Sequence, residues 1–157
     1  MTQTSPTSKP SAVARKKAAR LMAVQAVYQM AVNEREPAFV IDEYIFLRKN
    51  MEVDGETMVE PDESLFRDIV LGVSERLDDL TGIVAANRPQ KEEGLSHPNE
   101  PLLMAHLLCG TFELLAHQDV DFPVIISSYV EVAKAFFAGH EPSLINAILD
   151  SVRKVTR

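Results

Sequence analysis

Residues 14–32, ARKKAARLMAVQAVYQMAV, decide the fold. The stretch contains no Pro or Gly and much alanine, and its apolar residues recur at helical spacing, so it predicts one long helix. Its first turns carry basic side chains and no acidic one, namely Arg15, Lys16, Lys17 and Arg20. We therefore expect a helix whose apolar shaft is buried in a core and whose basic front stays in water, where it can bind an anionic group.

The charge distribution separates this basic front from the rest of the chain. Residues 1–20 hold five basic and no acidic side chains, which leaves 11 basic against 23 acidic ones in residues 21–157, a net charge of −12. Because an acidic body repels anions, a basic segment on it suggests an anionic partner of its own. The alternative is a solubilising tail or a plain helix start, but cations at a helix N-terminus oppose the macrodipole.

The composition is that of one globular domain. The chain has 157 residues, of which 46% are hydrophobic and 25% charged. With Cys109 as the single cysteine, no intramolecular disulfide can form, so we expect a reducing compartment. No apolar run approaches the roughly 20 residues that a membrane span needs, and no signal peptide is recognisable. These features predict a cytoplasmic protein.

The fold class predicted from periodicity is all-α, because no segment alternates with period two. We expect a disordered tail over residues 1–10 and one helical domain over residues 11–157. The predicted helices are six: 12–32 capped by Ser11, 37–49, 62–86 capped by Asp62, 99–115 capped by Asn99, 121–138, and one opened by Pro142. The fourth is apolar on nearly every side, so it should be the most buried. Residues 50–60 and 87–98 are predicted loops.

Single residues give further expectations. Gly72 lies inside the third predicted helix, where we expect close packing against another helix. Asn146, between two isoleucines, should be buried and hydrogen-bonded. If one ring of the Phe136–Phe137 pair is exposed, it is a candidate for base stacking or for contact with a protein.

Catalytic motifs are not recognisable in the sequence. It shows no glycine-rich phosphate loop, nucleophile elbow or His-Glu zinc motif, so we expect neither an enzyme nor a cofactor. His106 and Cys109 stand three residues apart on one predicted helix. A pair without two further ligands is more typical of packing than of a metal site.

Four motifs, in order along the chain, resemble those of the NusB family. They are VQAVY (24–28) preceded by Arg20, FRDIVLGV (66–73), FELL (112–115), and the segment 120–152 with DFP (121–123), AKAF (133–136) and INAILD (145–150). The resemblance spans about residues 14–155. It implies an all-α fold of two packed three-helix halves.

The resemblance also implies a function. The family comprises transcription antitermination factors that bind single-stranded boxA RNA in ribosomal RNA transcripts, together with the ribosomal protein NusE, in the antitermination complex of RNA polymerase. In the family the basic start of the first helix contacts RNA, so the predicted RNA-binding residues are Arg15, Lys16, Lys17 and Arg20. A surface on the fourth to sixth helices would hold NusE, and the predicted contacts there are Ser127, Ser128, Glu131 and Phe136.

Some positions depart from the family pattern. Ser127-Ser128 replaces Asn-Glu, Leu108 stands where a basic residue is expected, and His140 replaces a carboxylate. These departures leave an alternative open. The protein would then be a NusB-like protein–protein interaction module that no longer binds RNA, for example a homodimer formed through the basic helix.

Overall fold

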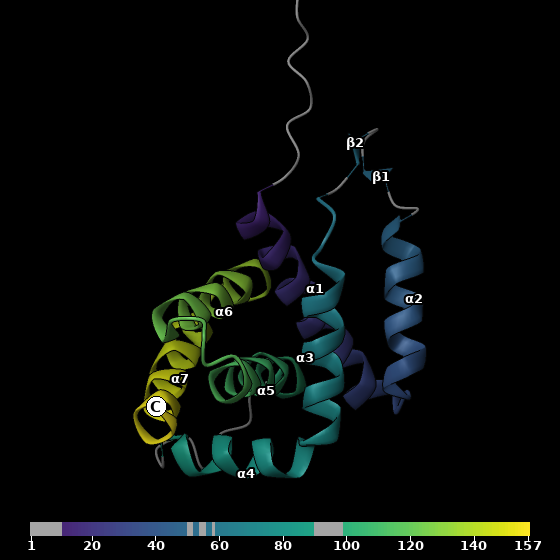
Figure 1. Cartoon of the computed structure of the whole chain (residues 1–157). Coiled ribbons are helices and arrows are strands. Elements are labelled where there is room, and N and C mark those ends of the chain that lie inside the picture. The colour runs from purple at the N-terminus through teal and green to yellow at the C-terminus, as the bar shows by residue number, and fades with distance from the viewer. Residues whose placement is uncertain (1–10, 50–51, 54–55, 58, 90–98) are drawn as a thin grey trace, which may run out of the picture.

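The computed structural model describes residues 11–49, 52–53, 56–57, 59–89 and 99–157. This part of the chain forms helices with one small hairpin (Figure 1). The elements are α1 (Ala12–Asn33), α2 (Pro37–Lys49), β1 (Glu52–Val53), β2 (Glu56–Thr57), α3 (Glu63–Glu75), α4 (Leu77–Asn87), α5 (Glu100–Ala116), α6 (Phe122–Phe136) and α7 (Glu141–Thr156). The all-α class is confirmed. The predicted tail, residues 1–10, and most of the loop at 87–98 lie outside the described residues.

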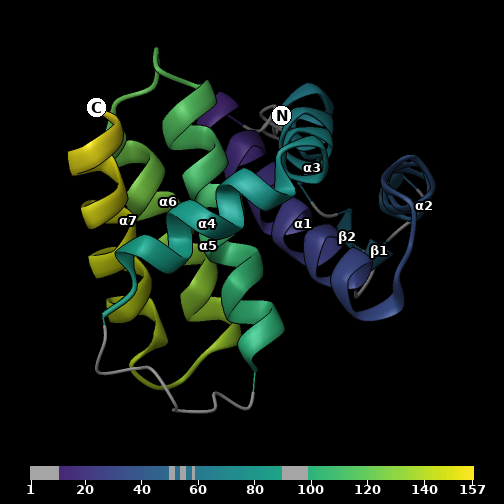
Figure 2. The same ribbon diagram turned by 90° about the horizontal axis from the view of Figure 1, so that it is seen from below.

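The helices form two groups that meet along α1 and α5. Helices α1, α2 and α3 contact one another, and α4 to α7 make the second group (Figures 1 and 2). Helix α5 contacts every other helix except α2, and its residues 105–114 are all buried. The prediction of a central buried helix is therefore confirmed. No described helix is long and apolar enough to cross a membrane.

The prediction of one helix over residues 62–86 was wrong, because this segment forms two helices, α3 and α4. Helix α3 ends where the Arg76 N–H donates to the Gly72 carbonyl at 3.1 Å, and Arg76 itself has φ −113° and ψ 22°. Helix α4 then runs across the end of the bundle, where Leu80 and Val84 are buried. Because these two residues keep helical spacing with α3, one non-helical residue between the helices leaves no trace in the periodicity. The second group therefore has four helices, and the described chain has seven rather than six.

Several local signals behave as the sequence predicts. Ser11 Oγ accepts from the Ala14 N–H at 3.1 Å, and an Asp62 carboxylate oxygen accepts from the Leu65 N–H at 3.0 Å. Asn99 precedes α5, but its side chain makes no capping bond. The expectation for Asn146 was wrong, since its side chain is exposed on the outer face of α7. The predicted loop at 50–60 contains the antiparallel β1–β2 pair.

Gly72 confirms the expected close packing. A Cβ built on it would lie 2.1 Å from the Phe112 ring, which comes from α5. This distance is much shorter than a van der Waals contact, so the Phe112 ring can occupy this position against α3 only because residue 72 has no side chain.

We predict that Gly72→Ala lowers the free energy of unfolding by about 1–3 kcal/mol, because the Phe112 ring must leave its place. Gly82→Ala on α4 is the matched control. Nothing lies within 4 Å of its added Cβ, so it should raise stability by up to about 1 kcal/mol through helix propensity. Urea unfolding followed by circular dichroism measures both variants. Equal effects would contradict the packing argument.

Candidate nucleic-acid interface

Three of the predicted RNA-binding cations lie exposed on the first turns of α1. Arg15, Lys16 and Lys17, hereafter the basic front, have no acidic neighbour in the first turn of the helix. The start of α1 is held in place by α3, because the Asp62 N–H donates to the Arg15 carbonyl at 3.0 Å. The Arg15 Nε also donates to the Glu60 carbonyl at 3.4 Å. The cations are thus presented on a fixed support.

The fourth cation does not fit the prediction. Arg20 is only 4% exposed, and its guanidinium binds both oxygens of Glu113 on α5, at 2.7 and 3.0 Å. Its Nη1 donates to the Ser128 hydroxyl on α6 at 3.2 Å. A guanidinium held in this way cannot reach an RNA phosphate, so Arg20 anchors the helix instead. Its partners lie 93 and 108 residues away, which sequence spacing cannot show.

Glu113 is the centre of a buried polar network. Besides Arg20, it accepts hydrogen bonds from the Tyr129 hydroxyl at 2.5 Å and from His117 Nδ1 at 2.9 Å. Burial alone would raise the pKa of Glu113. The hydrogen bonds from His117 and Arg20, with the charge of Arg20, outweigh burial and lower this pKa to about 2. Glu113 is therefore a carboxylate whose lone pairs are taken up inside the protein.

His117 continues the network to the surface. Its Nδ1 faces Glu113, and its Nε2 lies 2.5 Å from the Asp68 carboxylate on α3. A carboxylate can only accept, so both contacts are hydrogen bonds when each ring nitrogen carries a proton, and this geometry favours the imidazolium form of His117. In agreement, the hydrogen bond to Glu113, with a further one to Asp68, raises the pKa of His117 against the opposing effect of burial.

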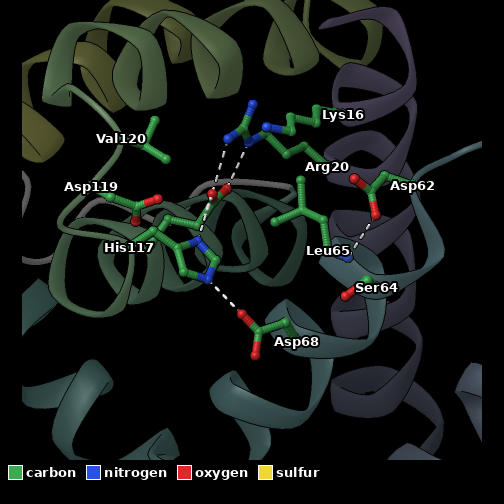
Figure 3. Close-up of a pocket in the computed structure, with 10 residues that line it drawn as sticks. Lys16, Arg20, Asp62, Ser64, Leu65, Asp68, His117, Asp119 and Val120 are labelled. Carbon is green, nitrogen blue, oxygen red and sulfur yellow. Dashed lines mark hydrogen bonds and ion pairs between the residues drawn. The ribbon is translucent and has the colours of Figure 1, made fainter. Parts of the chain in front are cut away.

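Two hollows lie beside the start of α1. The first, hereafter the His117 pocket, has a volume of about 230 Å³ (Figure 3). It is lined by Lys16 and Arg20 of α1, by Asp62, Ser64, Leu65 and Asp68 at α3, and by Glu113, His117, Asp119 and Val120. The second, the α1–α6 groove, measures about 210 Å³ and is lined by Lys17, Ala18, Leu21, Glu131, Val132 and Ala135. Lys16 and Lys17 thus face different hollows.

The segment that closes the His117 pocket is held by Arg157. The guanidinium of Arg157 donates to three backbone carbonyls, those of Leu114, His117 and Val120, at 2.9, 2.8 and 2.7 Å. These carbonyls lie at the C-terminal end of α5 and in the segment after it. A cation there also complements the helix macrodipole.

The predicted partner-binding residues do not share one surface. Ser127 and Glu131 are exposed on α6, and Glu131 lies 3.6 Å from Lys134. Ser128 is nearly buried; it accepts from Arg20 and donates to the Val124 carbonyl at 2.7 Å, so it is not available to a partner as predicted. Phe136 is half-buried and Phe137 buried, so neither ring stands free for stacking.

The remaining candidates belong to the core. His106 and Cys109 are buried in α5, and burial lowers the pKa of His106 to about 4. Within the described ranges, no three His, Cys, Asp or Glu residues gather as they would around a metal ion. Sequence reasoning missed His117, Glu113 and Asp68 as a unit. The only signal was a buried acid in the most apolar helix, which needs a buried cation as a partner.

We predict that Arg20→Ala lowers the free energy of unfolding by about 3–5 kcal/mol, because the buried Glu113 loses the cation that binds both of its oxygens and keeps only His117 and Tyr129 as side-chain partners. Lys16→Ala, one turn earlier on the same helix, is the control and should change stability by no more than about 0.5 kcal/mol. Chemical unfolding of both variants at neutral pH is the measurement. A small effect of Arg20→Ala would show that the pair does not anchor α1.

The pKa of His117 also predicts a pH dependence. Because the folded state raises this pKa above 6.5, the stabilisation is complete below pH 6.5 and is lost as the pH rises through the folded value. The free energy of unfolding should therefore fall from pH 6 to pH 9, and fall less in His117→Gln. His106, whose folded pKa is lowered to about 4, has the opposite effect up to about pH 7, because its imidazole still loses a proton there in the unfolded state; this contribution is shared by wild type and variant, so the difference between the two slopes reports His117. Identical slopes for wild type and variant would be evidence against the imidazolium.

Comparison with known proteins supports the family resemblance that the sequence motifs indicate. The sequence model of the NusB family matches residues 17–154. Transcription antitermination proteins NusB from Sinorhizobium medicae and Rhizobium meliloti are each 44% identical over 143 residues, which cover 89% of this chain and 86% of the relative.

Two solved structures share the fold. T. maritima NusB superposes with a TM-score of 0.69 at 20% identity, over 88% of this chain and 90% of that one. A complex of the antitermination factors NusB and NusE with double-stranded RNA gives a TM-score of 0.71 at 14% identity, over 90% and 97%. The resemblance seen in the motifs is confirmed, and the chain belongs to the NusB family.

Proposed function

We propose that the protein is a transcription antitermination factor that binds boxA-type RNA of ribosomal RNA transcripts together with NusE. The observation that carries the proposal is the exposed basic front on a chain of this family, where relatives at 44% identity are antitermination proteins. The protein would act by binding, without catalysis or cofactor. Because its target is a nascent transcript, we infer a cytoplasmic location.

The basic front supports the RNA part of the proposal. Its three cations are exposed on one rigid helix start, and the rest of the chain is acidic. Cations that neutralise phosphates release counterions, so binding of this kind is strongly salt-dependent. Arg20 takes a different role in the proposal: it fixes the helix that carries Arg15, Lys16 and Lys17.

The charge of the body supports a basic protein partner such as NusE. Residues 21–157 carry a net charge of −12, which favours association with a basic surface. Of the predicted partner-binding residues, Ser127 and Glu131 remain suitable, since both are exposed on α6. Glu131 and Lys17 line the same α1–α6 groove, so the proposed partner surface adjoins the proposed RNA surface.

The alternative, an interaction module that no longer binds RNA, has less support. One observation in its favour was that Leu108 stands where the family pattern has a basic residue. The Leu108 side chain is buried in α5, so this departure does not remove a charge from the surface. Within the part of the chain that the structure describes, the three cations of the basic front are exposed, which an RNA-binding surface requires.

We predict that Lys16→Glu with Lys17→Glu weakens boxA RNA binding at least tenfold and leaves helicity unchanged. The slope of log affinity against log salt should become shallower by about 0.7 for each phosphate that the variant no longer neutralises. Fluorescence anisotropy of labelled RNA, with and without NusE at two salt concentrations, measures both quantities. Lys154→Glu, an exposed cation near the end of α7, is the matched control.

The proposal fails if the double variant binds RNA as the wild type does. Retained NusE binding with no RNA affinity in the wild type would favour the alternative. Self-association that disappears in the double variant would identify the basic helix as a homodimer interface.

A further inference from the structure

The His117 pocket opens beside the basic front, and Lys16 belongs to both. A strand whose phosphates lie along Arg15, Lys16 and Lys17 would therefore pass the mouth of the pocket. Its volume of about 230 Å³ is below the roughly 300–1,000 Å³ of pockets for drug-sized ligands. The pocket suits one planar base rather than a whole nucleotide chain.

The walls of the pocket are preorganised for a base. The His117 ring is fixed by carboxylates on both sides, Glu113 and Asp68, and Leu65 and Val120 add apolar surface. Figure 3 shows His117, Leu65 and Val120 around a common space, with Lys16 above and Asp68 below. Bases of single-stranded RNA are splayed out, stacked on flat side chains including histidine, and hydrogen-bonded along their edges.

The polar groups of the pocket select among the bases. Asp62, Asp68 and Asp119 supply acceptors, and Ser64 adds a hydroxyl. Asp62 and Asp68 each use one carboxylate oxygen for the bonds to Leu65 and His117, and Asp119 is exposed. The Lys16 ammonium lies at the same pocket and can only donate.

Guanine matches this arrangement better than the other bases. Its Watson–Crick edge places two adjacent donors, N1–H and the N2 amine, beside one acceptor, O6. One carboxylate can accept both donors, while the ammonium donates to O6. Adenine and cytosine place a ring nitrogen acceptor next to their amine, and uracil has a single donor between two acceptors, so each would turn lone pairs toward a carboxylate.

Other occupants fit less well. A phosphate would meet three aspartates, and the guanidinium of a partner protein would meet Lys16 and the His117 imidazolium. A neutral base with both donors and an acceptor avoids either conflict.

We propose that the His117 pocket binds a guanine base of the RNA strand whose phosphates the basic front holds. This inference rests on the proposed function and deepens it. His117 supplies a rigid ring, an aspartate of the pocket reads N1–H and N2, and Lys16 reads O6.

The test uses eight-nucleotide oligouridines with one central guanosine, inosine or uridine, titrated by anisotropy into the full chain with NusE present. Inosine lacks only the N2 amine. Loss of one member of a bidentate pair is worth about tenfold, so the guanosine oligonucleotide should bind about tenfold more tightly than the inosine one. Ser64→Phe fills the pocket and should abolish that preference. Thr81→Phe, an exposed position on α4, is the control and should retain it.

Equal affinity for guanosine and inosine would overturn the proposal, as would an unchanged preference in Ser64→Phe. A loss of NusE binding in that variant, with the base preference intact, would assign the pocket to a protein side chain instead. If no oligonucleotide binds, the phosphate contacts of the proposed function fail. The pocket is then judged by titrating 5′-GMP and 5′-UMP against the His117 imidazole NMR signals, where a shift by UMP equal to that by GMP overturns the proposal.

Discussion

The structure depends on one buried ion pair, that between Arg20 and Glu113. Both side chains are shielded from water, and the hydroxyls of Ser128 and Tyr129 complete their hydrogen bonds. Buried charges are tolerated only when they are paired and hydrogen-bonded, because desolvation of an isolated ion costs several kcal/mol. The pair therefore joins α1 to α5, and the hydroxyls of Ser128 and Tyr129 connect it to α6.

The exposed cations depend on this pair. Lys16 and Lys17 lie one turn before Arg20 on the same helix, so their positions follow from the way the guanidinium is held. The His117 pocket depends on it as well, since Glu113 holds both Arg20 and His117. The buried network and the proposed binding surface are thus connected: Arg20 positions the helix that carries Lys16 and Lys17, and Glu113 positions the His117 ring.

Some features of the structure could be predicted from the sequence and others could not. The extent of α1, the caps Ser11 and Asp62 and the close approach at Gly72 were predictable, because each depends on neighbours along the chain. Other features depend on distant residues. The burial of Arg20 needs Glu113, and the exposure of Asn146 depends on which face of α7 meets the core. The same side chain type can bind a phosphate or anchor a core, and only the tertiary partner decides.

The three hydrogen bonds from Arg157 carry a mechanical consequence. They fasten the end of α7 to the last turn of α5 and to the segment 117–120, whose residues His117, Asp119 and Val120 line the His117 pocket. If the last turn of α7 moved away from the body, all three hydrogen bonds would break together, and the segment 117–120 would lose this support. The shape of the His117 pocket, next to the N-terminal helix α1, thus depends on hydrogen bonds from Arg157 in the C-terminal segment.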